Sequence, residues 1–77
     1  MRECFVSFAS ATQVQDFVNI ATKQTFAIQV VLDQMTANAK SIMSLYSMGL
    51  RRRLKVLLPE TVDAEDFLQA VKPYLAD

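Results

Sequence analysis

The stretch AKSIMSLYSMGL, residues 39–50, decides how the rest of this sequence is interpreted. Ser41 suits the start of a short helix, because a serine hydroxyl there can accept a hydrogen bond from an unpaired backbone N–H. Gly49 suits the position just past the helix end, where a left-handed backbone costs little only for glycine. The apolar residues between them are Ile42, Met43, Leu45, Tyr46 and Met48. They are too many for one narrow buried stripe on a short helix, so we expect some of them to face outward.

The composition is that of a globular protein with enough apolar residues to form a core. Of the 77 residues, 52% are hydrophobic, and 8 basic side chains balance 8 acidic ones. A neutral chain has no overall field to attract nucleic acid or a membrane, and no stretch approaches the roughly 18 apolar residues of a spanning helix. Cys4 has no second cysteine to pair with, in keeping with a reducing cytosol. We therefore expect residues 1–77 to form a single soluble cytoplasmic domain.

The first part of the chain has the pattern of a strand followed by a helix. Cys4, Val6 and Phe8 alternate with other residues, which is typical of a strand with one apolar face. Ser10 and Thr12 each precede a glutamine by three positions, so two overlapping capping boxes predict a helix start. The residues that then fall at helical spacing are Val14, Phe17, Val18 and Ala21.

The middle of the chain has the pattern of a hairpin, a short helix and a further strand. The run 26–32 is rich in β-branched residues and predicts a strand, and residues 35–38 would pair back on it after a tight turn. The helix of residues 39–49 follows. Leu54, Val56 and Leu58 alternate as the fourth strand.

The chain ends in a pattern typical of a helix. Asp63 can cap it, and Pro73 predicts that it kinks or ends early. Its expected apolar positions are Phe67, Leu68, Val71 and Leu75. The element order is then β-α-β-β-α-β-α, and the two long helices need the same sheet to bury their apolar faces. The sequence therefore predicts an α+β sandwich with helices on one face of a four-stranded sheet.

Residues 40–49 resemble the HPr family, the small phosphocarrier proteins of the bacterial sugar phosphotransferase system. Many members have a Lys-Ser-Ile-Met run, a short apolar helix and a Leu-Gly or Met-Gly ending, as this sequence has. The resemblance implies the HPr-like fold, an open-faced sandwich with an antiparallel sheet. It also implies that Ser41 is the serine that a dedicated kinase phosphorylates.

The same resemblance fails at the residue that carries phosphate in the family. That residue is a histidine in a Gly-x-His-x-Arg-Pro run before the first helix, and this chain has no histidine. The loop of residues 9–13 is also shorter than in the family. Ser10 and Thr12 lie nearest the vacated position, but a phosphoester on a hydroxyl is a far poorer donor than a phosphoimidazole. We interpret both as helix caps and expect no histidine phosphocarrier activity and no catalysis.

The resemblance then favours a regulatory or protein-binding role. In the family, phosphorylation at the position of Ser41 helps the apolar helix dock on a transcriptional regulator of carbon catabolite control. The residues expected to contact a partner are Lys40, Ile42, Tyr46 and Met48. The expected partner is such a regulator, a serine kinase or a phosphotransferase-system enzyme, and not nucleic acid or a membrane.

Two alternatives remain open from the sequence. One is a phosphocarrier component of sugar uptake that uses an acceptor other than histidine. The other is a small α/β domain that forms a weak homodimer through its exposed apolar helix.

The remaining polar residues predict no cofactor or metal site. The basic run 51–53 is interpreted as a solvated turn, with a small anion site beside Ser41 as the alternative. The carboxylates of Asp63, Glu65 and Asp66 suit the first turn of a helix. No His and Cys spacing suits a metal ion.

Overall fold

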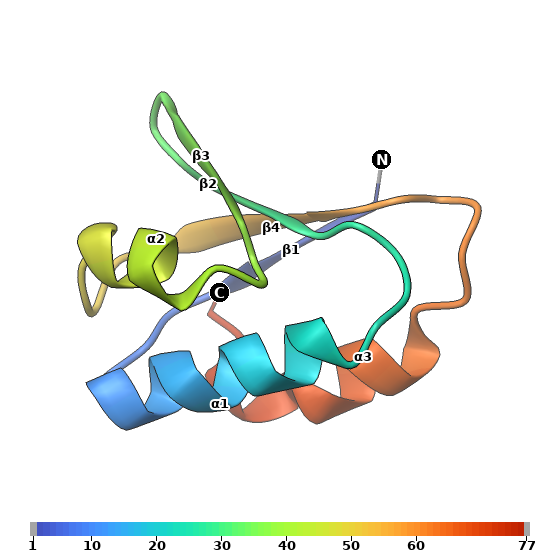
Figure 1. Ribbon diagram of the computed structural model, residues 1–77, viewed down its shortest axis with the longest axis horizontal. Helices are drawn as coiled ribbons and strands as arrows, with labels where there is room; N and C mark the ends of the chain where they lie inside the picture. Colours follow the sequence, from blue (N-terminus) through green and yellow to red (C-terminus); the bar gives the residue numbers. More distant parts are fainter. Residues whose placement is uncertain (1, 77) are drawn as a thin grey trace.

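The computed structural model describes residues 2–76, whose helices and strands follow the predicted order. They are β1 (Arg2–Val6), α1 (Ala11–Thr22), β2 (Gln29–Leu32), β3 (Met35–Asn38), α2 (Ile42–Ser47), β4 (Leu54–Leu58), α3 (Glu65–Ala70) and the single 3₁₀ turn η1 (Lys72–Tyr74). The strands form an antiparallel sheet in the order β1-β4-β2-β3. Figure 1 shows α1 and α3 beneath one face of this sheet and α2 at one end of it. The predicted open-faced α+β sandwich is confirmed.

The longest helix, α1, buries the stripe that its sequence predicts. All four predicted positions are buried against the core: Val14, Phe17, Val18 and Ala21. The opposite side of the helix carries exposed polar residues such as Gln15, Asp16 and Asn19. Burying a phenylalanine such as Phe17 stabilises the fold by about 1.5–3 kcal/mol, so this stripe is what fixes α1 to the sheet.

The strand β4 alternates as predicted, with every second side chain buried, whereas the edge strand β3 has no buried residue. Leu54, Val56 and Leu58 of β4 are all buried, and Val6 of β1 lies opposite Leu54 in the register. Aromatic rings continue this core, because the centroid of the Phe8 ring lies 5.1 Å from that of Phe17 and Phe17 lies 6.0 Å from Phe67. Edge-on and tilted ring pairs at these distances add to the stability given by area alone.

The last helix ends earlier than a continuous apolar stripe would require. It stops at Ala70, and Pro73 lies in η1, as the proline predicts. Leu75 was expected on the buried stripe, but this expectation is wrong, because its side chain is 48% exposed. After η1 the chain is extended and pairs with the free edge of β1, where Ser7 N–H donates to the Tyr74 carbonyl at 2.9 Å and Ala76 N–H donates to the Phe5 carbonyl at 2.8 Å. The C-terminal segment therefore covers an edge that would otherwise expose unpaired backbone groups.

The face of the sheet away from the helices has a half-buried apolar centre. Phe5 lies there, and the Arg53 guanidinium sits 3.7 Å above the centre of its ring. Lys55, beside Phe5 in the register, forms an ion pair with Glu3 at 3.9 Å. Long basic side chains thus shield the aromatic ring of the open face from water, as their aliphatic stems and cation–π contacts allow.

Candidate functional site

The turn between β1 and α1 is organised around Ser10, the residue before the helix. Ser10 has an extended backbone, and its Oγ accepts a hydrogen bond from the Gln13 N–H at 3.3 Å. In return, Gln13 Oε1 accepts a hydrogen bond from the Ala9 N–H at 2.8 Å. Thr12, the other predicted start, lies inside the first turn with an exposed side chain. The Ser10 hydroxyl therefore serves as a helix cap.

The start of α1 lies at the same end of the molecule as α2 (Figure 1). The two regions are joined by a hydrogen bond from the Arg51 N–H to the Phe8 carbonyl, at 2.7 Å. Gly49 has a φ of 88°, as predicted for the residue past the helix end, and Arg51 has a φ of 61°. A non-glycine residue rarely adopts this left-handed conformation, so the short backbone hydrogen bond is what holds Arg51 there.

Ser41 is the residue just before α2, as predicted, but its hydroxyl does not cap the helix. Its Oγ lies 3.0 Å from Ser44 Oγ, one turn into α2, and either hydroxyl can be the donor. The backbone of Ser41 is held by its N–H, which donates to the Asn38 carbonyl at 2.9 Å. The side chain is half-exposed. Ser41 therefore combines a fixed backbone with a hydroxyl that is not tied to the helix backbone.

Lys40 stabilises the turn before α2. Its Nζ donates a hydrogen bond to the Gln24 carbonyl at 2.8 Å, near the end of α1, and its backbone N–H donates to Asn38 Oδ1 at 2.9 Å. Lys40 was expected among the residues that contact a partner. In this structure its ammonium group already has an internal partner, so it contributes to the shape of the site.

The buried and exposed apolar residues of α2 are not all the ones that the sequence predicted. Met48 was expected on the exposed surface, and this is wrong, because its side chain is only 3% exposed and belongs to the core. Ile42 is half-buried and packs on the core, while Tyr46 is 39% exposed as expected. Two further apolar side chains, which were not among the residues expected to contact a partner, are exposed: Met43 is 73% exposed and Leu50 is 43% exposed.

We call Met43, Tyr46 and Leu50 the α2 patch. Met43 and Tyr46 are three positions apart in the helix and so share one side of it, and Leu50 follows just after the helix. The complementary spacing, Leu45 and Met48, forms the buried side. Because both sides of the helix carry an apolar i, i+3 pair, spacing alone gave no signal that separates the buried side from the exposed one.

The three consecutive arginines do not converge on one site. Arg51 turns the backbone, Arg52 forms an exposed ion pair with Asp33 at 3.8 Å, and Arg53 covers Phe5. The structure thus gives Arg52 and Arg53 separate contacts, with Asp33 and Phe5, and an anion site beside Ser41 stays a prediction.

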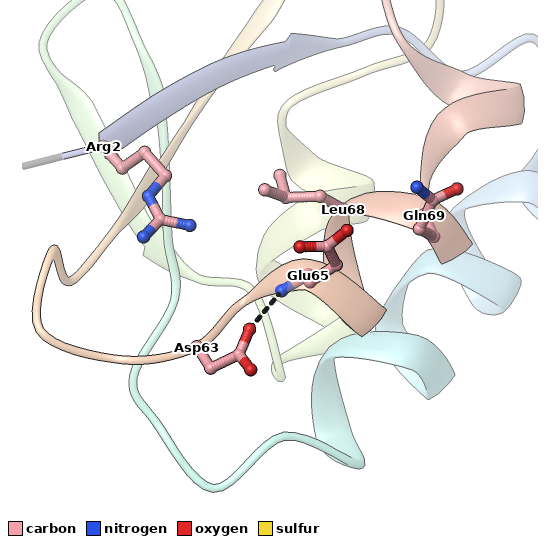
Figure 2. Close-up of a pocket in the computed structure, with 5 residues that line it drawn as sticks. All are labelled: Arg2, Asp63, Glu65, Leu68 and Gln69. Carbon is pink, nitrogen blue, oxygen red and sulfur yellow. Dashed lines mark hydrogen bonds between the residues drawn. The ribbon is translucent and has the colours of Figure 1, made fainter.

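A hollow of about 360 Å³ lies at the end of the sheet opposite to α2. Figure 2 shows Arg2 extending from β1 toward the start of α3, where Asp63 Oδ1 accepts a hydrogen bond from the Glu65 N–H at 3.1 Å. Asp63 was expected to cap this helix, and this is wrong, because Ala64 is the residue before α3 and no side chain caps the helix. The Asp63 bond instead stabilises the turn that leads into α3. The charged residues that line the hollow are exposed, and the lining includes no hydroxyl, thiol or imidazole group. We therefore place the candidate site at the other end, around Ser41 and α2.

Cys4 and the acidic residues offer no reactive centre. The Cys4 side chain is half-buried against the core, and burial raises the pKa of its thiol. A raised pKa leaves less thiolate, which is the nucleophilic form. Within residues 2–76, no group of His, Cys, Asp and Glu side chains suits a metal ion, and no helix is long and apolar enough to cross a membrane.

Residues 10–77 match the model of one protein family, PTS-HPr, described as the PTS HPr component phosphorylation site. This chain belongs to the HPr family. The matched region begins at Ser10 and includes Ser41 and the α2 patch. HPr proteins are phosphocarriers of the phosphotransferase system, not enzymes, and the enzymes of that system are their protein partners.

A solved HPr structure has the same fold. The chain is similar to the crystal structure of HPr-C-His from Thermoanaerobacter tengcongensis, with a TM-score of 0.74, 28% sequence identity, and coverage of 92% of this chain and 86% of that one. Among curated proteins, none matches the sequence. The predicted family and fold are confirmed, whereas the roles assigned to individual residues remain predictions.

Proposed function

We propose that this HPr-family protein is a regulatory or protein-binding module that acts through Ser41 and α2, and not through a phosphohistidine. The observation that carries this proposal is the residue at the start of α1. The chain has no histidine, and the residue there, Ser10, uses its hydroxyl to cap the helix. As in the family, we place this activity in the cytoplasm and in one HPr-like domain.

The chemistry of Ser10 argues against a relay through it. A relay needs an acceptor whose phosphoryl group leaves easily, and a serine phosphoester is stable compared with a phosphoimidazole. Ser10 Oγ already accepts the Gln13 N–H as a helix cap, and this structural role accounts for the residue without a relay.

The surroundings of Ser41 support it as the modified residue. It lies in the Lys-Ser-Ile-Met run that resembles the family's kinase site, and its hydroxyl is half-exposed and makes no helix cap. In the modification, Oγ bonds to the γ-phosphorus of ATP as the bond to ADP breaks, and the hydroxyl proton is lost to water. The product carries a charge near −2 at neutral pH, close to the start of the helix that bears the α2 patch.

The exposed apolar residues of α2 supply a contact for a protein partner. Met43 and Tyr46 expose a flexible thioether and an aromatic ring, side chains that are enriched at interfaces. Phosphorylation of Ser41 adds charge beside this apolar surface without altering it. The proposed partner is therefore a protein that binds the phosphate and the α2 patch together, such as a transcriptional regulator.

Intact-mass measurement with two phosphate donors tests this proposal. In one tube the protein is incubated with ATP and the family's serine kinase, and in the other with phosphoenolpyruvate and the upstream enzyme of the phosphotransferase system. We expect one added phosphate in the first tube only, lost in Ser41→Ala and retained in Ser10→Ala.

The opposite pattern would establish the alternative carrier function. Phosphate added from phosphoenolpyruvate, and lost in Ser10→Ala or Thr12→Ala, would show a hydroxyl acting as carrier and would overturn the proposal. Absence of phosphate in both tubes would also overturn the role assigned to Ser41.

A further inference from the structure

A pair of hydroxyl groups sets Ser41 apart from a simple helix cap. Ser41 Oγ and Ser44 Oγ lie 3.0 Å apart, a hydrogen-bond distance, and both side chains are half-buried. Ser44 lies in the first turn of α2, and its backbone is part of the helix. The backbone carbonyl of Ser44 also accepts a hydrogen bond from Ser47 Oγ at 2.7 Å. The Ser44 hydroxyl is therefore presented to Ser41 from a fixed position.

We propose that Ser44 is a positioning residue for Ser41, orienting its hydroxyl before phosphorylation and donating a hydrogen bond to the phosphate afterwards. This inference rests on the proposed function, because it concerns the same residue. It goes further in assigning a role to a hydroxyl that no sequence pattern had singled out.

Before modification, the pair restricts where the Ser41 hydroxyl points. A serine hydroxyl has one donor and two acceptor positions, and near the start of a helix it can turn toward the backbone N–H groups. In this structure it bonds to Ser44 instead, so the helix cap is absent. The Ser44 contact thus holds Oγ away from the helix backbone.

After modification, the direction of the hydrogen bond becomes fixed. Phosphorylated Oγ has no hydrogen left to donate, so only the Ser44 hydroxyl can be the donor. The charged phosphate oxygens, bonded through phosphorus to Ser41 Oγ, are much stronger acceptors than the ester oxygen. With Oγ of Ser44 starting 3.0 Å from the modified atom, a small rotation of the side chain brings its hydrogen to one of these oxygens.

A phosphate titration tests this role without any kinase. Phosphoserine is inserted at position 41 during synthesis, and its second ionisation is followed by ³¹P NMR in the otherwise unmodified protein, Ser44→Ala and Ser47→Ala. A donor to the dianion lowers its pKa, which is about 6 for free phosphoserine. We expect Ser44→Ala to raise this pKa by at least about 0.3 units, a twofold change in proton affinity.

Two further variants separate the hydrogen bond from other effects. Ser47→Ala is the matched control, because Ser47 Oγ bonds to the Ser44 carbonyl and not to Ser41, and it should titrate as the parent does. Ser44→Thr keeps a hydroxyl and should restore the lower pKa. Alanine favours helix more than serine does, so Ser44→Ala should fold, and amide NMR spectra check this. If it does not fold, Ser44→Cys, a weak donor, should show the same upward shift.

An unchanged pKa in Ser44→Ala, or an equal rise in Ser47→Ala, would overturn the role of Ser44. This outcome is independent of the kinase experiment. A protein that no kinase phosphorylates but that shows the titration shift would refute the proposed function and leave the hydroxyl pair established. A protein that the kinase phosphorylates but that shows no pKa shift in Ser44→Ala would support the proposed function and refute the role of Ser44.

Discussion

Ser10 and Ser41 occupy equivalent positions, each before a helix, yet their hydroxyls are used differently. Ser10 Oγ bonds to the backbone of α1, whereas Ser41 Oγ bonds to the side chain of Ser44. The first arrangement stabilises the fold, and the second leaves the hydroxyl free of the helix backbone. This difference supports the proposed division, in which Ser10 has a structural role and Ser41 is the residue that is modified.

Replacing the cap should destabilise the protein. Ser10→Ala removes the acceptor for the Gln13 N–H, and we expect it to lower the free energy of unfolding by about 1 kcal/mol, as measured by urea denaturation. Thr12→Ala is the control, since Thr12 is exposed inside the first turn, and should change stability by less than about 0.5 kcal/mol. Equal losses in the two variants would show that Ser10 is not the cap.

The Cys4 thiol should react only at elevated pH. Burial raises its pKa in the folded protein, so at any pH below that value the folded chain holds less thiolate than the unfolded chain. The rate of alkylation by iodoacetamide should therefore reach half its maximum at a higher pH in the folded protein than in urea. A midpoint at or below that of the unfolded chain would contradict the burial of Cys4.

The α2 helix shows how tertiary contacts choose between two possible faces. Its six residues, flanked by Met48, are apolar on more than one side. Leu45 and Met48 are buried, and Met43 and Tyr46 are exposed. The choice follows from packing between α1 and the sheet, which a short helix cannot specify through its own periodicity.

The helix α1 and the strand β4 were predictable because their apolar spacing admits only one orientation. In α1 the predicted stripe is buried throughout, and in β4 the alternation of Leu54, Val56 and Leu58 is observed. Leu75 was misplaced because the helix pattern continues past Pro73, although the backbone does not. The Ser41 to Ser44 contact was not predictable, since serines at this spacing are also compatible with separate caps and solvent contacts.

Replacing Met48 or Met43 by alanine should affect the stability of the protein to very different extents. Met48→Ala opens a cavity in the core and should lower the free energy of unfolding by about 2–5 kcal/mol, whereas Met43→Ala should change it by less than about 0.5 kcal/mol. Their exposures of 3% and 73% are the reason. Urea denaturation of both variants measures this. A larger loss for Met43→Ala would mean that α2 is rotated about its axis.

At the scale of the whole molecule, the sheet separates two ends with different properties. One end brings together the start of α1, α2 and the turn held by Arg51 (Figure 1). The other contains the open charged hollow beside Arg2 (Figure 2). The chain has the fold of an HPr protein, contains no histidine, and caps the start of α1 with Ser10.

The most direct test of this account measures how phosphorylation of Ser41 changes binding to the transcriptional regulator expected as partner. Isothermal titration calorimetry should give an affinity at least about tenfold higher for the phosphorylated protein than for the unmodified one. Tyr46→Ala should weaken this binding by about 1 kcal/mol or more, and Ser10→Ala should leave it unchanged. Equal affinities with and without phosphate on Ser41 would contradict the account.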